Sequence, residues 1–407
     1  MSLLPVADAI ARIVDGVLPL PAETVALAVA GGRVLAEDLS ARRSQPPFPA
    51  SAMDGYALRA AEAVEGATLR VIGTSAAGAR FTGGLGPGET VRIFTGAPVP
   101  DGADTVLIQE DAEVLPDGVI RVREAAQPGR HVRRAGLDFA AGDVLLPAGT
   151  RFGMRQLSLA AAMGHGTVGI RRMPRVALIA TGDELVPPGA DTGPDQIVSS
   201  NTVGLAAMVA RLGGEPHDLG IARDDAGAIE AAVRRALDIP ADIIVTLGGA
   251  SVGDHDYAKA ALEAAGMRLD FWRVAVRPGK PLMFGIVPDA GGRVRARVLG
   301  LPGNPVSALV GGLLFLEPLI AALLGVPLRD RTEPARLAVD MGKNDTRQDY
   351  VRATLAVSDD GLPLVTPLAL QDSSMLSALA AADCLLIRPP HAPAARAGAA
   401  CRILRLP

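Results

Sequence analysis

Three short stretches in the middle of the chain are rich in glycine and polar residues, and two of them also carry carboxylates. Residues 181–184 read Thr-Gly-Asp-Glu, residues 248–256 read Gly-Gly-Ala-Ser-Val-Gly-Asp-His-Asp, and residues 302–307 read Pro-Gly-Asn-Pro-Val-Ser. Glycine-rich turns can cradle phosphate with backbone N–H groups, and carboxylates can hold a metal ion. Because phosphate and carboxylates repel each other, a divalent cation is expected between them. Mg²⁺ is the best fit, since it binds carboxylates together with substrate phosphate.

The candidate metal ligands in these turns are Asp183, Glu184 and Asp256. Each aspartate taken alone is more simply explained as a helix cap, which is a common place for aspartate. Three such turns at one edge of a sheet favour a binding site instead. The remaining candidates in these turns are expected to bind substrate: Gly248, Gly249, Ser251, Pro302, Gly303, Asn304, Pro305 and Ser307.

A second group of candidates is cationic. Arg277 and Lys280 flank a Pro-Gly turn, and Arg273 lies just upstream. Lysine is scarce in this chain, which makes Lys280 conspicuous. Several cations on a rigid turn beside a glycine-rich crevice would bind an oxyanion. The alternative is a solvated basic hairpin, although Pro278 and Pro281 remove flexibility that such a hairpin would keep.

Asp54 poses a separate question. It follows three prolines and small residues in the stretch QPPFPASAMDGYALR, residues 45–59. An Asp-Gly pair is a normal turn signal, but the rigid approach is more than a turn requires. Asp54 is therefore either a turn residue or a carboxylate held in place for chemistry.

The elements that would position the three turns alternate between strands and helices. This alternation predicts βαβ units in a mostly parallel, doubly wound sheet. Ligands of such sheets bind beyond the carboxyl ends of the strands, where these turns fall. The expected strands are 175–180, 215–222, 241–249 and 297–300, and the expected helices are 201–214, 223–237, 256–266 and 306–325. Asn201 is predicted to cap its helix, and Asp224 and Asp225 suit the start of the next one.

The whole chain is predicted to be an α/β multidomain protein. Residues 1–170 form an N-terminal region with helical segments over 1–45 and a β-rich insertion at about 55–150. Residues 171–326 form the α/β domain, and residues 327–407 form a small β domain.

Composition excludes several functional classes. The chain has 407 residues, 49% of them hydrophobic, and a formal net charge of −4, which argues against nucleic acid as the main partner. Its two cysteines make no disulfide framework, and the scattered histidines do not support a zinc site.

No segment is predicted to enter a membrane. The N-terminus reads as an amphipathic helix rather than a signal peptide. The apolar run 306–325 contains Glu317 and Pro318, so a buried helix on a sheet explains it better than a membrane span. The protein is therefore expected to be soluble and cytoplasmic.

Seven motifs in this order resemble one family. They are SAMDGYA, TGAPVPDGADTV, RRAGLDFAAGD, ALIATGDELV, GGASVGDHDY, VRPGKPLMFG and LGLPGNPVSAL. The chain closely resembles the molybdopterin molybdenumtransferases, the molybdenum-insertion enzymes that include the E domain of gephyrin. The resemblance implies that adenylylated molybdopterin is cleaved, molybdate is inserted at its dithiolene, and AMP leaves. It also implies a homodimer whose site lies between the α/β domain of one subunit and the N-terminal β region of the other.

The resemblance also implies roles for individual residues. Asp54, Glu184, Asp224 and Asp256 would be catalytic, and Asp54 would join Asp183, Glu184 and Asp256 at the metal. Thr95 and Asp138 would bind substrate. The molybdate pocket would hold Arg277, Lys280, Ser307 and Arg352, with Ser373 or Ser374, and Arg273 nearby.

This sequence departs from the family pattern in two places. Many relatives carry lysine where Arg273 and Arg277 stand, and an arginine fork is not equivalent to an ammonium. The C-terminal motif is often rich in glycine and serine, but here it reads QDSSMLS. Its Asp372 puts a negative charge near the expected anion pocket.

Two other functions remain open. One is a non-catalytic scaffold of the gephyrin E-domain type, and the other is a related molybdopterin adenylyltransferase. Possible partners are an adenylyltransferase and a molybdoenzyme or its chaperone.

Overall fold

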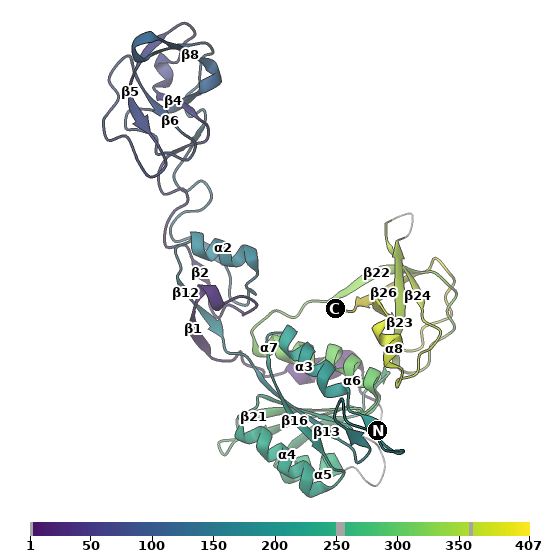
Figure 1. Cartoon of the computed structure of the whole chain (residues 1–407). Coiled ribbons are helices and arrows are strands. Elements are labelled where there is room, and N and C mark those ends of the chain that lie inside the picture. The colour runs from purple at the N-terminus through teal and green to yellow at the C-terminus, as the bar shows by residue number, and fades with distance from the viewer. Residues whose placement is uncertain (1–2, 250–256, 358–360) are drawn as a thin grey trace. The chain divides into compact units, whose positions relative to one another are not determined.

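A computed structural model describes residues 3–249, 257–357 and 361–407, which form two compact units (Figure 1). The larger, here the α/β unit, contains Met1–Glu23, Gly32–Ala36 and Ile170–Pro407. The smaller, here the β-rich unit, contains Thr24–Gly31 and Glu37–Gly169. The three-part division at residues 170 and 326 stays a prediction.

A six-stranded sheet dominates the β-rich unit, with the order β7-β4-β6-β5-β9-β8. Its strands are short because glycine, proline and aspartate turns interrupt them. Tyr56, Leu58, Leu107 and Ile120 form part of its apolar core. The bounds are β4 (Gly55–Leu58), β5 (Thr68–Ser75), β6 (Glu89–Ile93), β7 (Thr105–Ile108), β8 (Ala112–Leu115) and β9 (Val119–Val122).

Smaller elements complete this unit. Strand β3 (Ala50–Ser51) pairs with β10 (Val132–Arg133), and β2 (Leu39–Ser40) pairs with β11 (Val144–Leu146). The helices are α2 (Met154–Ala162) and the 3₁₀ turns η2 (Ala60–Glu62), η3 (Gln109–Asp111) and η4 (Pro116–Gly118). The predicted β-rich region is confirmed.

The N-terminal stretch is less helical than expected. Among the described residues up to 45, only α1 (Val6–Val14) is an α-helix. Helix α1 ends at Val14, where Asp15 is extended and Gly16 has a φ of +59°, and Pro19 and Pro21 disfavour a further helix because proline lacks the N–H that a helix needs. The chain continues as β1 (Ala22–Ala26) and the 3₁₀ turn η1 (Leu27–Val29), and it returns from the β-rich unit through β12 (Thr167–Arg171).

The α/β unit is built on a six-stranded sheet with the order β16-β13-β17-β21-β20-β18. The first four of these strands are parallel, and β20 runs antiparallel to both neighbours. The predicted mostly parallel sheet is confirmed. The bounds are β13 (Arg175–Thr181), β16 (Glu215–Ala222), β17 (Ile243–Leu247), β18 (Arg268–Trp272), β20 (Met283–Pro288) and β21 (Val294–Leu301).

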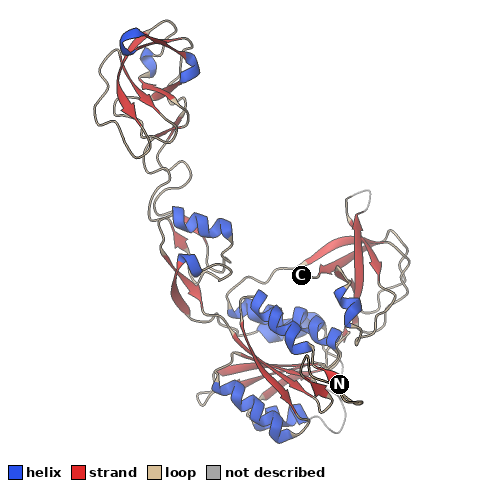
Figure 2. Cartoon of the chain, in the orientation of Figure 1, coloured by secondary structure: helices blue, strands red, loops and turns tan. Residues whose placement is uncertain are grey.

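Helices cover both faces of this sheet (Figure 2). One face packs against α1, α3 (Asn201–Arg211), α6 (Pro305–Gly311), the π-turn η5 (Gly312–Leu316) and α7 (Glu317–Leu323). The other face packs against α4 (Ala226–Asp238) and α5 (Tyr257–Ala264). Residues Pro305–Leu323 are long and apolar enough to cross a membrane, but 72% of their most apolar window is buried inside the protein. Their apolarity is accounted for by packing on the sheet, as the sequence predicts.

The C-terminal residues form a second sheet with the order β19-β23-β24-β22-β26-β25, in which β23 also pairs with β25. Its first strand, β19 (Val276–Arg277), comes from the segment that leads into the Pro-Gly turn. The other bounds are β22 (Thr332–Leu337), β23 (Gln348–Val357), β24 (Pro363–Pro367), α8 (Leu376–Ala380), β25 (Cys384–Arg388) and β26 (Ala400–Arg405). A minor pair, β14 (Leu185–Val186) and β15 (Ile197–Val198), lies in the loop after β13.

Candidate functional site

The carboxyl ends of β13, β17 and β21 surround a cavity of about 660 Å³. The turns that follow these three strands all contribute to its lining, as the sequence predicts. The cavity therefore lies at the edge where doubly wound sheets bind ligands. The predicted site residues in the lining are Glu184, Asp224, Gly248, Gly249, Pro302, Gly303, Asn304 and Pro305.

Glycine is required where β17 ends. Gly248 and Gly249 have φ values of +100° and +63°, which side chains of L-residues rarely adopt. A Cβ on Gly248 would lie 2.6 Å from the carbonyl oxygen of Thr181. The absence of side chains therefore lets this turn approach the end of β13 and leaves backbone facing the cavity.

Carboxylates gather at one side of the cavity. The Asp224 backbone N–H donates to Asp183 Oδ1 at 3.3 Å, and Asp224 and Glu184 both line the cavity. Burial raises the pKa of Asp224, and the negative charges of Glu184 and Asp183 raise it further. A carboxylate whose ionisation is disfavoured by two neighbouring negative charges lies in a suitable environment for a cation.

This set suits a magnesium ion that also binds substrate. Among the described residues, no group of three or more acidic, histidine or cysteine side chains could hold a metal by itself. Mg²⁺ usually takes one or two carboxylates and completes its shell with water and substrate phosphates. Glu184 and Asp224, with Asp183 beside them, fit that pattern. Ser251 and Asp256, two further predicted site residues, lie outside the described residues.

The Pro-Gly-Asn-Pro loop is held from two sides. Asn304 Nδ2 donates to Ser373 Oγ at 2.9 Å, and the Val306 N–H donates to the Ser373 carbonyl at 3.0 Å. On the other side, Asn201 Nδ2 donates to the Gly303 carbonyl at 2.7 Å. Ser373 thus contacts this loop and Ser374 lines the cavity, whereas their role in binding molybdate stays a prediction.

Asn201 is a cavity residue that the sequence analysis missed. It was predicted to cap α3, but it is the first residue of that helix, and Ser200 occupies the cap position without a side-chain cap bond. Its Oδ1 atom is buried and has no hydrogen-bond partner among the described residues. The only signal in the sequence was an amide side chain at the start of the helix that follows the paired strands β14 and β15.

The cationic turn lies against the Pro-Gly-Asn-Pro loop. A Cβ on Gly279 would meet the Ser307 carbonyl at 3.7 Å and Pro302 Cγ at 3.9 Å. Ser307 is 3% exposed, whereas Lys280 is exposed. The structure therefore brings together the two motifs that were expected to share an oxyanion.

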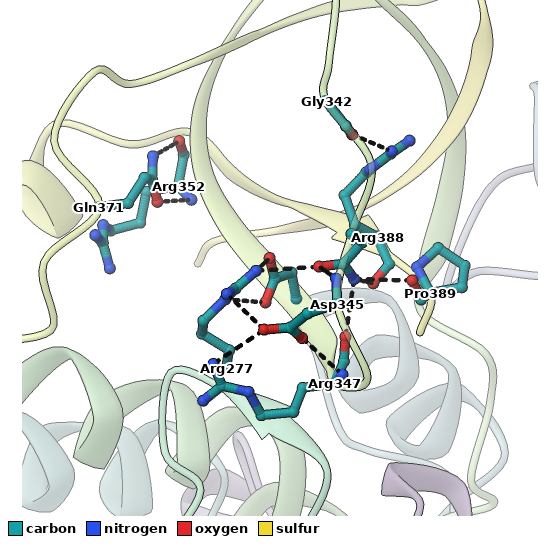
Figure 3. A network of polar contacts seen from close by, with 10 residues as sticks. Arg277, Gly342, Asp345, Arg347, Arg352, Gln371, Arg388 and Pro389 are labelled. Carbon is teal, nitrogen blue, oxygen red and sulfur yellow. Dashed lines mark hydrogen bonds and ion pairs between the residues drawn. The ribbon is translucent and has the colours of Figure 1, made fainter. Parts of the chain in front are cut away.

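Arg352 is the most deeply buried cation of this region, with 1% exposure. Its Nη2 donates to the carbonyls of Leu370 at 3.3 Å and Asp372 at 3.2 Å. Its Nε has no partner among the described residues, and burial lowers its pKa. Gln371, beside it in Figure 3, bonds the Arg352 backbone instead. The Asp372 carboxylate accepts from Ser374 Oγ at 2.6 Å, so its charge is partly satisfied there.

The other two predicted anion ligands are already engaged. Arg277 bonds both carboxylate oxygens of Asp349, and it contacts Asp345 Oδ2 and Asn344 Oδ1 at 3.0 Å each (Figure 3). The Arg273 guanidinium lies 5.4 Å from the Trp272 ring centre. An oxyanion-binding role for either arginine stays a prediction.

Asp54 lies in the β-rich unit, where it fixes a loop. Its Oδ1 accepts from the Thr95 N–H at 2.7 Å and from Thr95 Oγ1 at 2.8 Å. These two bonds hold the pKa of Asp54 below its ordinary value. The ionised form of Asp54 is therefore favoured, as a catalytic or metal-binding role would require. The same bonds to Thr95 also give Asp54 a structural role. Asp138 lines a separate cavity of about 580 Å³ together with Pro46, Phe48 and Arg133.

The cysteines play no part in this geometry. Both are free thiols, and Cys384 is buried. Burial raises the pKa of Cys384 to about 12, so it is not a thiolate near neutral pH.

Comparison with known families covers nearly the whole chain. Residues 4–164 match the MoeA N-terminal region (domain I and II), residues 177–322 match a probable molybdopterin binding domain, and residues 334–406 match the MoeA C-terminal region (domain IV).

Individual relatives agree with these matches. A molybdopterin molybdenumtransferase of Haemophilus influenzae is 36% identical over 374 residues, covering 91% of each chain. One of Bacillus subtilis is 34% identical over 395 residues, covering 95% of this chain and 90% of the relative. The crystal structure of a molybdopterin biosynthesis moeA protein from Pyrococcus horikoshii OT3 superposes with a TM-score of 0.84 at 26% identity, covering 100% of both chains. The chain belongs to the molybdopterin molybdenumtransferase family.

Proposed function

We propose that this protein inserts molybdate into adenylylated molybdopterin and releases AMP, giving the molybdenum cofactor. The cavity at the ends of β13, β17 and β21 is the observation that supports this most directly. It joins backbone suited to phosphate, carboxylates suited to a metal, and the loop that contacts the C-terminal sheet. Relatives over nine-tenths of the chain are named for the same transfer.

The molybdate pocket would lie where the cationic turn, the Pro-Gly-Asn-Pro loop and the C-terminal sheet meet. Lys280 and Arg352 supply positive charge, and Ser307 and Ser373 supply hydroxyl groups near them. Preorganised donors in a site that excludes water bind a dianion more strongly than the same groups in water. No covalent nucleophile is needed.

A magnesium ion at Glu184 and Asp224 would neutralise the phosphoanhydride and polarise the phosphorus atom under attack. Asp183 would support these carboxylates, and Asp256 would be a further ligand. The protein's own part is to hold the nucleotide phosphates on the backbone of Gly248 and Gly249. These turns would orient the phosphates before the reaction, so the protein need not be ordered further for the reaction to proceed.

The functional assembly would be a homodimer. In it, Asp54 of one subunit would approach the metal or nucleotide phosphates bound to the α/β unit of the other. Thr95, which already fixes Asp54, would keep the carboxylate in place, and Asp138 would contact substrate. We further propose a cytoplasmic location and transfer of the cofactor to a molybdoenzyme or its chaperone.

AMP release from adenylylated molybdopterin, with Mg²⁺ and with or without molybdate, tests the proposal. Molybdate-dependent release is the expected result. A folded protein that releases no AMP would contradict it and would favour a scaffold role. Incubation with ATP and molybdopterin is the matched control, because only an adenylyltransferase would make the adenylylated product from them.

A further inference from the structure

A polar cluster joins the cationic turn to the C-terminal sheet. It consists of Arg277, Asn344, Asp345 and Asp349 and is here named the Arg277 clasp (Figure 3). The guanidinium uses Nε and Nη2 for the two oxygens of Asp349, Nη1 for Asp345 and Nη2 again for Asn344. Asn344 is itself fixed, since its Nδ2 donates to the carbonyls of Arg347 and Pro389 at 2.8 Å each.

The backbone joins the same two elements. Strand β19 pairs with β23 in parallel, and this pairing sets Arg277 directly opposite Asp349. The Gln348 N–H donates to the Ala275 carbonyl at 2.8 Å. The bidentate ion pair therefore reinforces a strand pairing in which β19 is only two residues long. A pairing that short would be weak by itself.

The charge of Arg277 is already balanced. Asp349 is buried, with a side-chain exposure of 11%, and Asp345, which also pairs with Arg347, is a second carboxylate on the guanidinium. An oxyanion that displaced Asp349 would leave a buried carboxylate without its partner, which is strongly unfavourable. An oxyanion added beside both carboxylates would be repelled by them. Arg277 is thus a poor ligand for a dianion in this chain.

The clasp lies on the same strand as a better ligand. Strand β23 carries both Asp349 and Arg352, three residues apart. Arg352 is buried, bonds only carbonyl groups among the described residues, and follows the position of its strand. The segment between β24 and α8 accepts the bonds of Arg352 at Leu370 and Asp372, and its Ser373 contacts the Pro-Gly-Asn-Pro loop.

We propose that Arg277 is a positioning residue, whose fork holds Asp349 so that β23 keeps Arg352 at the oxyanion pocket. It does not contact the oxyanion. The identification of that oxyanion as molybdate rests on the proposed function, whereas the clasp does not.

Two single variants and their combination test this assignment. Arg277→Lys keeps the positive charge but loses the bidentate fork, and Asp349→Asn keeps Arg277 but removes its main partner. Both are expected to raise the molybdate concentration for half-maximal AMP release by roughly ten- to a hundredfold, the scale of a charge-assisted hydrogen bond. The nucleotide KM should change much less. The double variant should be no worse than either single variant, because both break one interaction.

Amide hydrogen exchange over residues 346–352 supplies a readout that does not depend on activity. Both variants are expected to exchange faster there, because the Gln348 N–H bond opens more often. Arg402→Lys is the control: Arg402 pairs with Asp330 at 2.7 Å in an exposed contact of the same sheet. It should change neither quantity.

A direct role for Arg277 predicts different results. Arg277→Lys would then keep molybdate affinity, or Asp349→Asn would leave it unchanged or improve it by freeing the guanidinium. Either result, or unchanged exchange in both variants, overturns the assignment. If the wild type releases no AMP, the proposed function fails, and faster exchange in both variants would still support the clasp.

Discussion

Replacement of Arg352 by methionine should separate function from stability. The side chain is 1% exposed, its Nε is unpartnered among the described residues, and its hydrogen bonds to two carbonyls are 3.2 and 3.3 Å long. A buried cation with such partners opposes folding, since burial lowers its pKa by disfavouring the charged form. Methionine has a similar length and removes that cost.

The two effects can be estimated separately. Loss of two long hydrogen bonds costs about 1 kcal/mol each. Removal of a buried charge returns about 1–4 kcal/mol, as measured when buried ion pairs are replaced by apolar side chains. The net change in stability should therefore lie between a loss of about 1 kcal/mol and a gain of about 2 kcal/mol. Loss of the cation from the oxyanion pocket should cost about 3 kcal/mol of molybdate binding, on the order of a hundredfold in affinity.

The assay pairs thermal unfolding with the molybdate dependence of AMP release. Arg297→Met is the matched control, because burial also lowers the pKa of Arg297 but that residue lies on β21 away from its carboxyl end. The control should keep molybdate affinity. A lower melting temperature for Arg352→Met together with unchanged molybdate dependence would refute the reasoning and make Arg352 a structural residue.

Three further predictions follow from other parts of the structure. Asp54→Ala should leave the fold intact, because Asp54 is not buried, yet abolish AMP release; normal turnover would show that Asp54 only fixes the Thr95 loop. Lys280→Ala should raise the molybdate requirement more than it weakens nucleotide binding, and equal effects in titrations of both substrates would remove Lys280 from the pocket. The raised pKa of Asp224 means that the folded protein binds this proton more tightly than the unfolded chain. Mg²⁺ affinity, measured by calorimetry, should therefore fall as pH falls through that raised pKa, and stability should fall slightly as pH rises through the same window. Asp224→Asn should remove both pH dependences, and their persistence would assign them to another group.

The cavity was predictable because its parts follow local rules. Each of its three turns comes directly after an apolar run that forms a buried strand. Parallel strands bring their carboxyl ends to one edge, so the order of elements alone placed Glu184, Gly248 and Gly303 together. A turn that needs a positive φ is predictable in the same local way, because glycine is the residue that adopts this backbone conformation most readily.

The partners of side chains were not predictable in this way. Arg277 lies 72 residues from Asp349 in the chain, and no spacing or periodicity links the two. The same limit hid the bond from Asn201 to Gly303, which spans 102 residues. Sequence patterns report which face a residue occupies, whereas an ion pair such as Arg277–Asp349 depends on which strands the fold brings side by side.

The two arginines of the expected oxyanion pocket illustrate why partners decide roles. Both are cations expected in the same pocket, and the family pattern separates them only by the lysine that many relatives carry at the position of Arg277. Arg277 is partly exposed and forms ion pairs with two carboxylates, so its charge serves to hold β23 in place. The buried Arg352 guanidinium bonds only carbonyl groups among the described residues, so its charge is available to an anion that enters the pocket. Because Asp349 and Arg352 share one strand, the first arginine can set the position of the second. Exchange of the two residue types should therefore be asymmetric: lysine at 277 disturbs position, whereas lysine at 352 keeps the charge and should retain more molybdate affinity than methionine does.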